Sequence, residues 1–205
     1  MYPDSVSAAE KSLIRLLQLA HAGERAAALA YQGHAASWWA RRERATLAQI
    51  EAEEWQHRSA VAEMLRQLNA APDPKQENIM WGVGSLIGLL CHLGGWLIPM
   101  YGAGKLESGN IWEYEYAARL AQCARHPEMI DALLEMAEVE WEHEAYFRSA
   151  VKSHKLGKVL PLWKIPAAKA QIRTDFAAFI REPGALSPEA ARENHPKVPK
   201  ETTHA

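Results

Sequence analysis

The sequence contains little of what marks secreted or nucleic-acid-binding proteins. Its two cysteines, Cys91 and Cys123, lie in apolar surroundings without CxxC spacing, so we expect neither a disulfide framework nor a thiolate metal site. Lysine and arginine together number 23 against 25 acidic residues, and this balance gives no sign of a nucleic-acid-binding surface. The first residues, MYPDS, lack the charged and apolar regions of a signal peptide. We therefore expect a cytoplasmic protein that binds no nucleic acid.

Long stretches with helical rather than alternating periodicity, separated by glycine and proline, predict an all-α fold. We expect helices over residues 7–36, 40–69, 108–124, 128–154 and 167–181. Ser7 and Glu10 have capping-box spacing at the start of the first helix. His126 and Pro127 form so short a turn that the helices on either side must be antiparallel neighbours. Residues 1–182 then form one domain, and residues 183–205 form a polar, proline-rich tail that we expect to be disordered.

The segment over residues 79–104 is apolar and rich in glycine, and His92 is its only basic or acidic side chain. A stretch of this length could span a bilayer, but its glycines and Pro99 argue against one smooth spanning helix. We therefore expect a buried or interfacial crossover. Protein, a twin subunit in a homo-oligomer or lipid could cover it, and a lipid contact would place the protein on the inner face of the membrane.

Two copies of the pattern Glu-x-x-His carry the strongest chemical signal. Glu54 and His57 form the first pair, and Glu140 and His143 form the second. This spacing puts both side chains of a pair on one helical face, about one turn apart, so each pair can reach a common point. Both faces are otherwise apolar, and charged groups rarely lie on such faces without a partner. A metal ion is the partner that this pattern indicates.

The other two core helices each offer a glutamate in similar surroundings. Glu24 lies on the apolar face of the first helix, and Glu113 lies near apolar residues of the third. Glu115 is the alternative to Glu113, because residues two apart point to different sides of a helix and only one can face the metal. Tyr31 and Tyr116 follow Glu24 and Glu113 at helical spacing, which suits either a hydrogen bond beside the metal or simple core packing.

One glutamate from each of two helices, with Glu-x-x-His from each of two others, is the ligand pattern of ferritin-like proteins with two metal ions. The predicted fold is therefore a ferritin-like antiparallel four-helix bundle with an extra crossover and a C-terminal helix. Carboxylate-rich ligation with one imidazole per ion suits two iron ions, with manganese as the alternative, whereas tetrahedral zinc needs fewer ligands. The competing interpretation is a bundle whose ionic core residues pair with one another, or a relative that has lost its metal.

Beyond this pattern, the sequence resembles the demethoxyubiquinone hydroxylase family, whose members are membrane-associated di-iron monooxygenases of ubiquinone biosynthesis. The resemblance covers residues 10–180. It is carried by His21-Ala-Gly-Glu24, Tyr31-Gln-Gly33-His34, Glu54-x-x-His57, Trp81 with the glycine-rich segment after it, and Glu140-x-x-His143.

That resemblance implies an activity and a set of ligands. The family's metal ligands fall on Glu24, Glu54, His57, Glu113 or Glu115, Glu140 and His143. The implied reaction uses O2 and a reductant to insert one oxygen atom into the ring of a quinone or quinol. The resemblance also implies that residues 79–104 contact a membrane surface and help the enzyme to draw an apolar, polyprenyl substrate from it.

Three alternatives stand beside this hypothesis. A ferritin-like protein could handle iron or peroxide without an organic substrate, but the long apolar segment is not typical of a storage cage. A hydroxylase of modified tRNA would need a basic surface, which a formal net charge of −2 does not indicate. A metal-free interaction bundle would bind no iron when purified.

Overall fold

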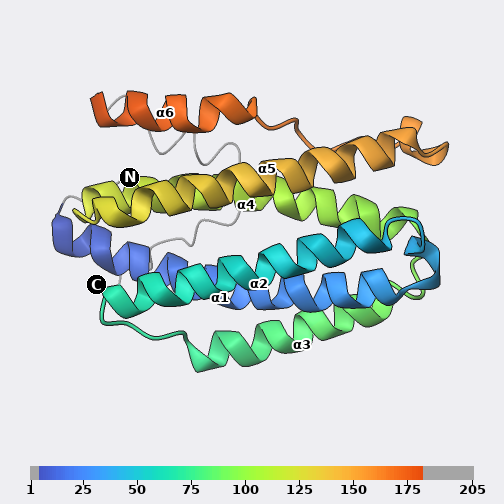
Figure 1. Ribbon diagram of the computed structural model, residues 1–205, viewed down its shortest axis with the longest axis horizontal. Helices are drawn as coiled ribbons and strands as arrows, with labels where there is room; N and C mark the ends of the chain where they lie inside the picture. The colour runs from blue at the N-terminus through green and yellow to red at the C-terminus, as the bar shows by residue number, and fades with distance from the viewer. Residues whose placement is uncertain (1–4, 182–205) are drawn as a thin grey trace, which may run out of the picture.

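Residues 5–181 are described by the computed structural model, and six α-helices account for most of this range (Figure 1). They are α1 (Val6–Ala36), α2 (Arg44–Gln67), α3 (Pro74–Leu90), α4 (Leu97–Cys123), α5 (Ile130–Ser153) and α6 (Lys169–Arg181). Short 3-10 helices lie at Trp38–Ala40 (η1), Pro127–Met129 (η2) and Leu156–Lys158 (η3). No strand occurs within the described range, which confirms the predicted all-α class. The predicted tail over 183–205 lies outside the described residues.

The helices lie along the long axis of the molecule, and consecutive helices run in opposite directions (Figure 1). α1 packs on α2, and α4 packs on α5, which confirms the antiparallel pair predicted around His126 and Pro127. α1 also contacts α4 and so joins the two pairs. α3 covers the outer side of α1, and α6 lies on α5 and α4.

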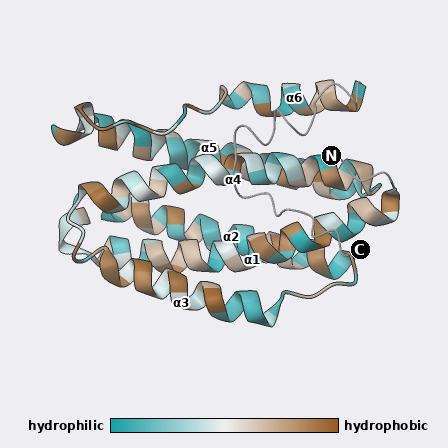
Figure 2. Ribbon diagram, turned by 180° about the vertical axis from the view of Figure 1, so that it is seen from behind, coloured by the Kyte–Doolittle hydropathy of each residue, from teal (hydrophilic) through white to brown (hydrophobic). Residues whose placement is uncertain are grey.

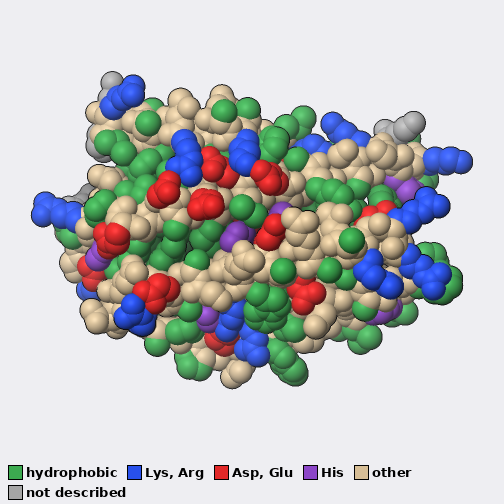
Figure 3. Space-filling view, in the orientation of Figure 1, with side chains coloured by type: hydrophobic (Ala, Val, Ile, Leu, Met, Phe, Trp, Pro, Cys, Tyr) green, Lys and Arg blue, Asp and Glu red, His purple; other side chains and the backbone are tan. Residues whose placement is uncertain are grey.

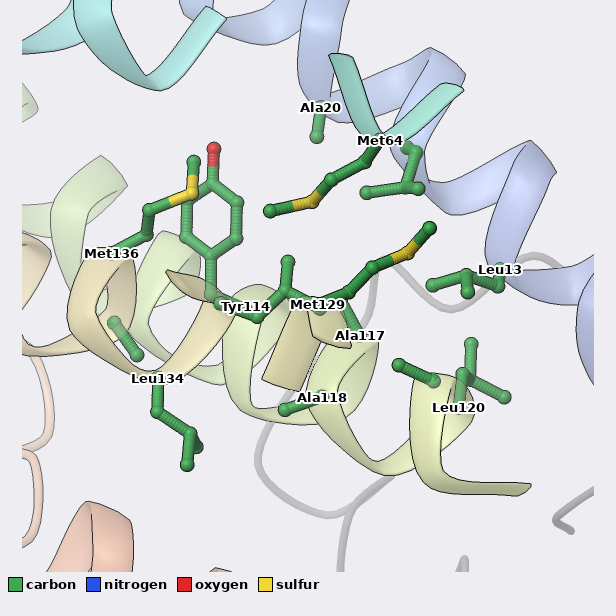
Figure 4. Close-up of a cluster of buried hydrophobic side chains, with 14 of the residues drawn as sticks. Leu13, Ala20, Met64, Tyr114, Ala117, Ala118, Leu120, Met129, Leu134 and Met136 are labelled. Carbon is green, nitrogen blue, oxygen red and sulfur yellow. The ribbon is translucent and has the colours of Figure 1, made fainter. Parts of the chain in front are cut away.

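The main hydrophobic core is built from residues of α1, α2, α4, α5 and α6. Figure 4 shows part of it, where Leu13 of α1, Met64 of α2, Leu120 of α4 and Met129 of η2 converge. Leu13 and Leu120 are completely buried. Because each fully buried side chain of this size contributes about 1.5–3 kcal/mol, apolar packing is a main source of stability at this end of the molecule.

Three predicted helix starts are wrong. α2 begins at Arg44 rather than near residue 40. α1 begins at Val6, because the side chain of Ser5 accepts a hydrogen bond from the amide of Ala8, so the predicted capping box at Ser7 is not used. α4 begins at Leu97 rather than near residue 108. Gly95 has φ of 68°, a conformation that favours glycine, and the chain reverses there into α4. The predicted crossover over 79–104 is therefore divided between α3, a short loop and the first turns of α4.

The glycines of α3 serve close packing against α1. A Cβ atom on Gly33 of α1 would overlap the backbone of Gly88, and a Cβ atom on Gly84 would overlap the backbone of Ala26. The inner side of α3 thus lies directly on α1. None of the described helices is both long enough and apolar enough to cross a membrane.

The side of α3 that faces away from α1 exposes many large apolar side chains, which we call the α3 apolar face. Figure 2 shows hydrophobic residues along much of this helix. The α3 apolar face consists of Ile79, Trp81, Val83, Leu86, Ile87, Leu89 and Leu90.

Candidate metal centre

Two glutamates at the middle of α2 and α5 lie at the centre of a buried acidic cluster. Glu54 and Glu140 are both completely buried. Each belongs to two groups of four residues whose ligand atoms all lie within 4.8 Å of one another. We call them the His57 group (Glu24, Glu54, His57 and Glu140) and the His143 group (Glu54, Glu107, Glu140 and His143). Because both groups contain Glu54 and Glu140, these two carboxylates could bridge two ions.

The two histidines reach across the core toward the glutamate of the opposite pair of helices. Nδ1 of His57 lies 3.1 Å from a carboxylate oxygen of Glu140. Nδ1 of His143 lies 3.4 Å from an oxygen of Glu54 and 3.8 Å from one of Glu140. In each Glu-x-x-His motif, the glutamate and the histidine point into the same buried cluster, as their spacing predicts.

The glutamate from α4 is Glu107, and not Glu113 or its alternative Glu115. Glu107 is buried and belongs to the His143 group, whereas Glu113 and Glu115 are half-buried and belong to neither group. The reason is which face of α4 is turned toward the cluster. Tyr114 lies two turns after Glu107 and points inward, so its two neighbours are each turned about 100° away from the cluster. Glu115 instead lies beside Arg119, at 3.9 Å.

Two buried tyrosines join α1 and α4 reciprocally. Tyr31 of α1 donates a hydrogen bond to Glu107 of α4, and Tyr114 of α4 donates one to Glu24 of α1. Each tyrosine lies two helical turns after the glutamate of its own helix and bonds the glutamate of the other. Tyr31 was singled out by its spacing, but Tyr116 was not the right residue of α4, because it stacks on Trp112 instead.

Further contacts surround the ligand atoms and were not expected from the sequence. Asn110, one turn after Glu107, donates a hydrogen bond to that carboxylate at 2.9 Å. Glu53, beside Glu54 in the chain, lies 2.7 Å from Nε2 of His143. Figure 3 shows histidine and acidic side chains reaching the surface in the middle of the face between α2 and α5. The first contact lies within one turn of α4, whereas the second joins α2 and α5, so no local spacing could have revealed the second.

The cluster strongly perturbs the acidity of its members. Burial raises the pKa of Glu54 and Glu107 well above the ordinary value, and the charge of Glu140 adds to the shift. Burial raises the pKa of Glu24 as well. It acts in the same direction on Glu140, but the neighbouring His143 and His57 outweigh it and hold the pKa of that carboxyl below its usual value. Four carboxyl groups in one dry site cannot all be charged without compensating cations.

Several buried ligand atoms make no hydrogen bond of suitable geometry within the described range, even where they lie within ion-pair distance of one another. They are Oε2 of Glu24, both carboxylate oxygens of Glu54, Oε1 of Glu140 and Nδ1 of both His57 and His143. Such atoms are expensive to bury, and native proteins leave few of them. Four carboxylates would balance the charge of two divalent cations, and two imidazoles complete the donor set. The residues therefore fit a pair of divalent metal ions.

An ionic network anchors the cluster to α3. Glu77 of α3 lies 2.7 Å from Nδ1 of His21 and accepts hydrogen bonds from Arg58 and Arg25. Because His21 precedes Glu24 by one turn and Arg58 follows His57 directly, the network ties α3 to both ligand-bearing segments of α1 and α2. The side chain of Glu77 is largely buried, so this pairing is shielded from water.

No protein-family model matches this chain, and no curated protein or solved structure is significantly similar to it.

Proposed function

We propose that this protein is an O2-dependent di-iron hydroxylase that resembles demethoxyubiquinone hydroxylase, built on a ferritin-like bundle of α1, α2, α4 and α5. One observation carries the proposal: two buried four-residue groups share Glu54 and Glu140 as common members. A single ion would need only one such group. Two groups with shared carboxylates are the arrangement that a dinuclear centre requires.

The donor set favours two iron ions, with manganese as the alternative. Each group supplies three carboxylates and one imidazole, and this oxygen-rich mixture suits iron and manganese better than zinc, which prefers four nitrogen or sulfur donors in structural sites. Bound iron would supply the activation of O2. Glu54 and Glu140 would help to hold both ions, with Glu24 and His57 holding one of them and Glu107 and His143 the other.

The surrounding residues orient these ligands and keep the site dry. Tyr31 and Tyr114 hold Glu107 and Glu24 from opposite helices, and Asn110 holds the second oxygen of Glu107. The phenol groups are buried, and burial raises the pKa of both tyrosines well above its usual value, so they remain hydrogen-bond donors. A protected site of this kind directs an activated oxidant to a bound substrate rather than to solvent.

The outer surface favours an apolar substrate delivered from a bilayer. Leu86 and Leu89 of the α3 apolar face are 56% and 62% exposed, and a contiguous exposed apolar surface marks an interaction site. Trp39 of η1 donates a hydrogen bond to the carbonyl of His92, so exposed Trp38 and Trp39 lie at the end of this face. Indole rings favour the boundary between lipid and water.

The catalytic part of the proposal is tested by product formation. The iron-loaded protein, a chemical reductant and a quinol carrying a short prenyl tail should consume O2 and yield a hydroxylated ring that contains one oxygen atom from labelled O2. Glu140→Ala should abolish the product, whereas Glu142→Gln, a surface charge change near the site, should retain it. Rapid O2 consumption with Fe(II) alone and no ring product would favour the iron- or peroxide-handling alternative.

The membrane part is tested with vesicles that contain anionic lipid. The protein should float with the vesicles, and a Leu86→Asp, Leu89→Asp variant should not. Leu156→Asp is the matched control, because Leu156 is equally exposed but lies on η3, away from α3. If the double variant leaves flotation unchanged and instead converts an oligomer to a monomer, a second copy of the chain covers this face and the membrane proposal fails.

A further inference from the structure

The two histidines of the metal centre have different partners on the side that faces away from the cluster. Nε2 of His143 lies 2.7 Å from Oε2 of Glu53. Gln49 donates a hydrogen bond to the other oxygen of Glu53 at 3.0 Å, which fixes the orientation of this carboxylate. Among the described residues, Glu140, which lies on the cluster side, is the only carboxylate within ion-pair distance of His57. His143 therefore has a carboxylate behind its imidazole, whereas within residues 5–181 His57 has none.

This difference departs from an otherwise symmetric arrangement. The pair α1–α2 and the pair α4–α5 each supply one Glu-x-x-His motif, one further glutamate and one tyrosine, and the tyrosine contacts are reciprocal. Glu53 directly precedes Glu54 of the first motif, and Val139 directly precedes Glu140 of the second. Val139 thus holds the position from which a carboxylate would reach His57. A valine cannot accept a hydrogen bond there.

We propose that Glu53 is a positioning residue that makes the two metal positions unequal, so that the His143 group holds its ion more tightly than the His57 group. The proposal rests on the dinuclear centre proposed above. A carboxylate that accepts the Nε2 proton of a histidine leaves the Nδ1 lone pair for the metal, fixes the ring and makes the imidazole a stronger donor. Only the Nδ1 atom of His143 benefits from this effect.

The position of Glu53 also argues against a purely structural role. Its side chain is 28% exposed, so the charge itself could be solvated without help from His143. The two groups come from helices α2 and α5, whose backbones come close to each other at few points. The contact is therefore better explained by what it does to His143 than by what it adds to the packing.

The inference is tested by anaerobic calorimetric titration of the metal-free, full-length protein with Co(II), followed in parallel by visible absorption. The wild type should bind two ions in two resolved steps. Glu53→Ala should weaken the tighter step about 10–100-fold, which is the usual effect of removing such a partner, and leave the weaker step unchanged. Glu53→Gln keeps an acceptor but loses the charge, so its effect should be smaller. The absorption of the first ion bound should change in both variants.

Two further variants make the test specific. Glu142→Gln removes a charge next to His143 in the chain, but Glu142 pairs with Lys169 on the surface, so both steps should stay as in the wild type. Val139→Glu should strengthen the weaker step and bring the two affinities together. The thermal midpoint of each metal-free variant is measured alongside, since a merely structural role for Glu53 would lower that midpoint without changing the spectrum of the first ion.

The experiment distinguishes a failure of this inference from a failure of the proposed dinuclear centre. Two Co(II) ions that bind with equal affinity in the wild type, or a Glu53→Ala variant with both steps unchanged, would overturn the inference and leave the dinuclear centre intact. A wild-type protein that binds no Co(II) at all would overturn the dinuclear centre and the inference with it.

Discussion

The pair α1–α2 and the pair α4–α5 are alike on the sides that face each other and different on the sides that face away. Inside, each supplies a Glu-x-x-His motif, a glutamate and a tyrosine to one cluster. Outside, α1 carries α3 on a close glycine contact, whereas α5 carries α6 and the segment after η3. The inner sides are alike because both pairs supply side chains to the same cluster. The outer sides differ because different segments cover them.

The outer sides also use different anchors. On α1 and α2, the anchor is ionic: Glu77 accepts hydrogen bonds from Arg58 and Arg25 and contacts His21. On α5, Arg148 pairs with Glu144 and donates hydrogen bonds to the backbone of Trp163 and Lys164. The second anchor fixes a loop, whereas the first lies directly behind two ligand-bearing segments.

The largest stability effect should come from breaking the first anchor. Glu77→Ala leaves Arg58 and His21 without their buried partner and should lower the free energy of unfolding by about 3 kcal/mol. Arg173→Ala removes the exposed pairs with Asp131 and Glu138 on the other side of the molecule and should cost less than about 1 kcal/mol. Urea denaturation of both variants measures the difference, and equal costs would show that the Glu77 network is not an anchor.

A second contrast is between the cluster, whose histidines face acids, and the end of α1, where His34 is buried without a partner for Nε2 in the described part of the chain. Burial lowers the pKa of His34 to about 4 from an ordinary 6.5. The unfolded chain therefore takes up this proton first, so the stability that neutral His34 provides is complete above pH 6.5 and is lost as the pH falls toward 4. The loss should approach about 3 kcal/mol.

His34→Leu should remove this part of the acid sensitivity. The difference in unfolding free energy between pH 7 and pH 4 should become smaller in the variant by about the same 3 kcal/mol. Chemical denaturation at each pH is the measurement. An unchanged pH dependence would show that His34 takes up its proton without disturbing the fold.

Two glycine substitutions separate the effect of close packing between α1 and α3 from the effect of glycine on the stability of a helix. Gly33→Ala places a Cβ atom against the backbone of Gly88 and should cost about 1–3 kcal/mol through overpacking. Gly82→Ala has nothing within 4 Å of the added atom and should stabilise α3 by about 0.5–1 kcal/mol. Thermal unfolding compares them. Effects of the same sign would mean that α3 does not lie closely on α1.

The smallest predicted effects on stability test whether the two tyrosine–glutamate contacts are equivalent. Tyr31→Phe and Tyr114→Phe each remove one hydrogen bond to a buried glutamate and should each lower the free energy of unfolding of the metal-free protein by about 1 kcal/mol. The reciprocal arrangement predicts similar values for the two. Denaturation curves that differ by more than about 2 kcal/mol would break the equivalence of the two helix pairs.

The sequence predicted the parts of this arrangement that depend on local periodicity. Glu54, His57, Glu140 and His143 were found because their spacing of three residues is itself the geometric requirement. Glu24 was found because it is a charge on a long apolar face. These five residues are all brought together in the two groups.

The residues that were missed depend on where a helix begins or on contacts between helices. Glu107 was overlooked because the glycines before it predicted a helix start near residue 108, whereas α4 continues back to Leu97. Once the start is known, the inward face runs through Glu107 and Tyr114 and excludes Glu113. Glu53 was not selected from the sequence, because its contact with His143 joins two different helices.

Metal content after purification without added metal tests the central claim most directly, in the wild type and in the variants Glu54→Ala, Glu107→Ala and Glu113→Ala. The account predicts about two iron ions per chain in the wild type and in Glu113→Ala, with most of the metal lost when Glu54 or Glu107 is replaced. A wild-type protein that holds no metal even after anaerobic loading with Fe(II) would contradict the account. So would loss of metal in Glu113→Ala together with full retention in Glu107→Ala.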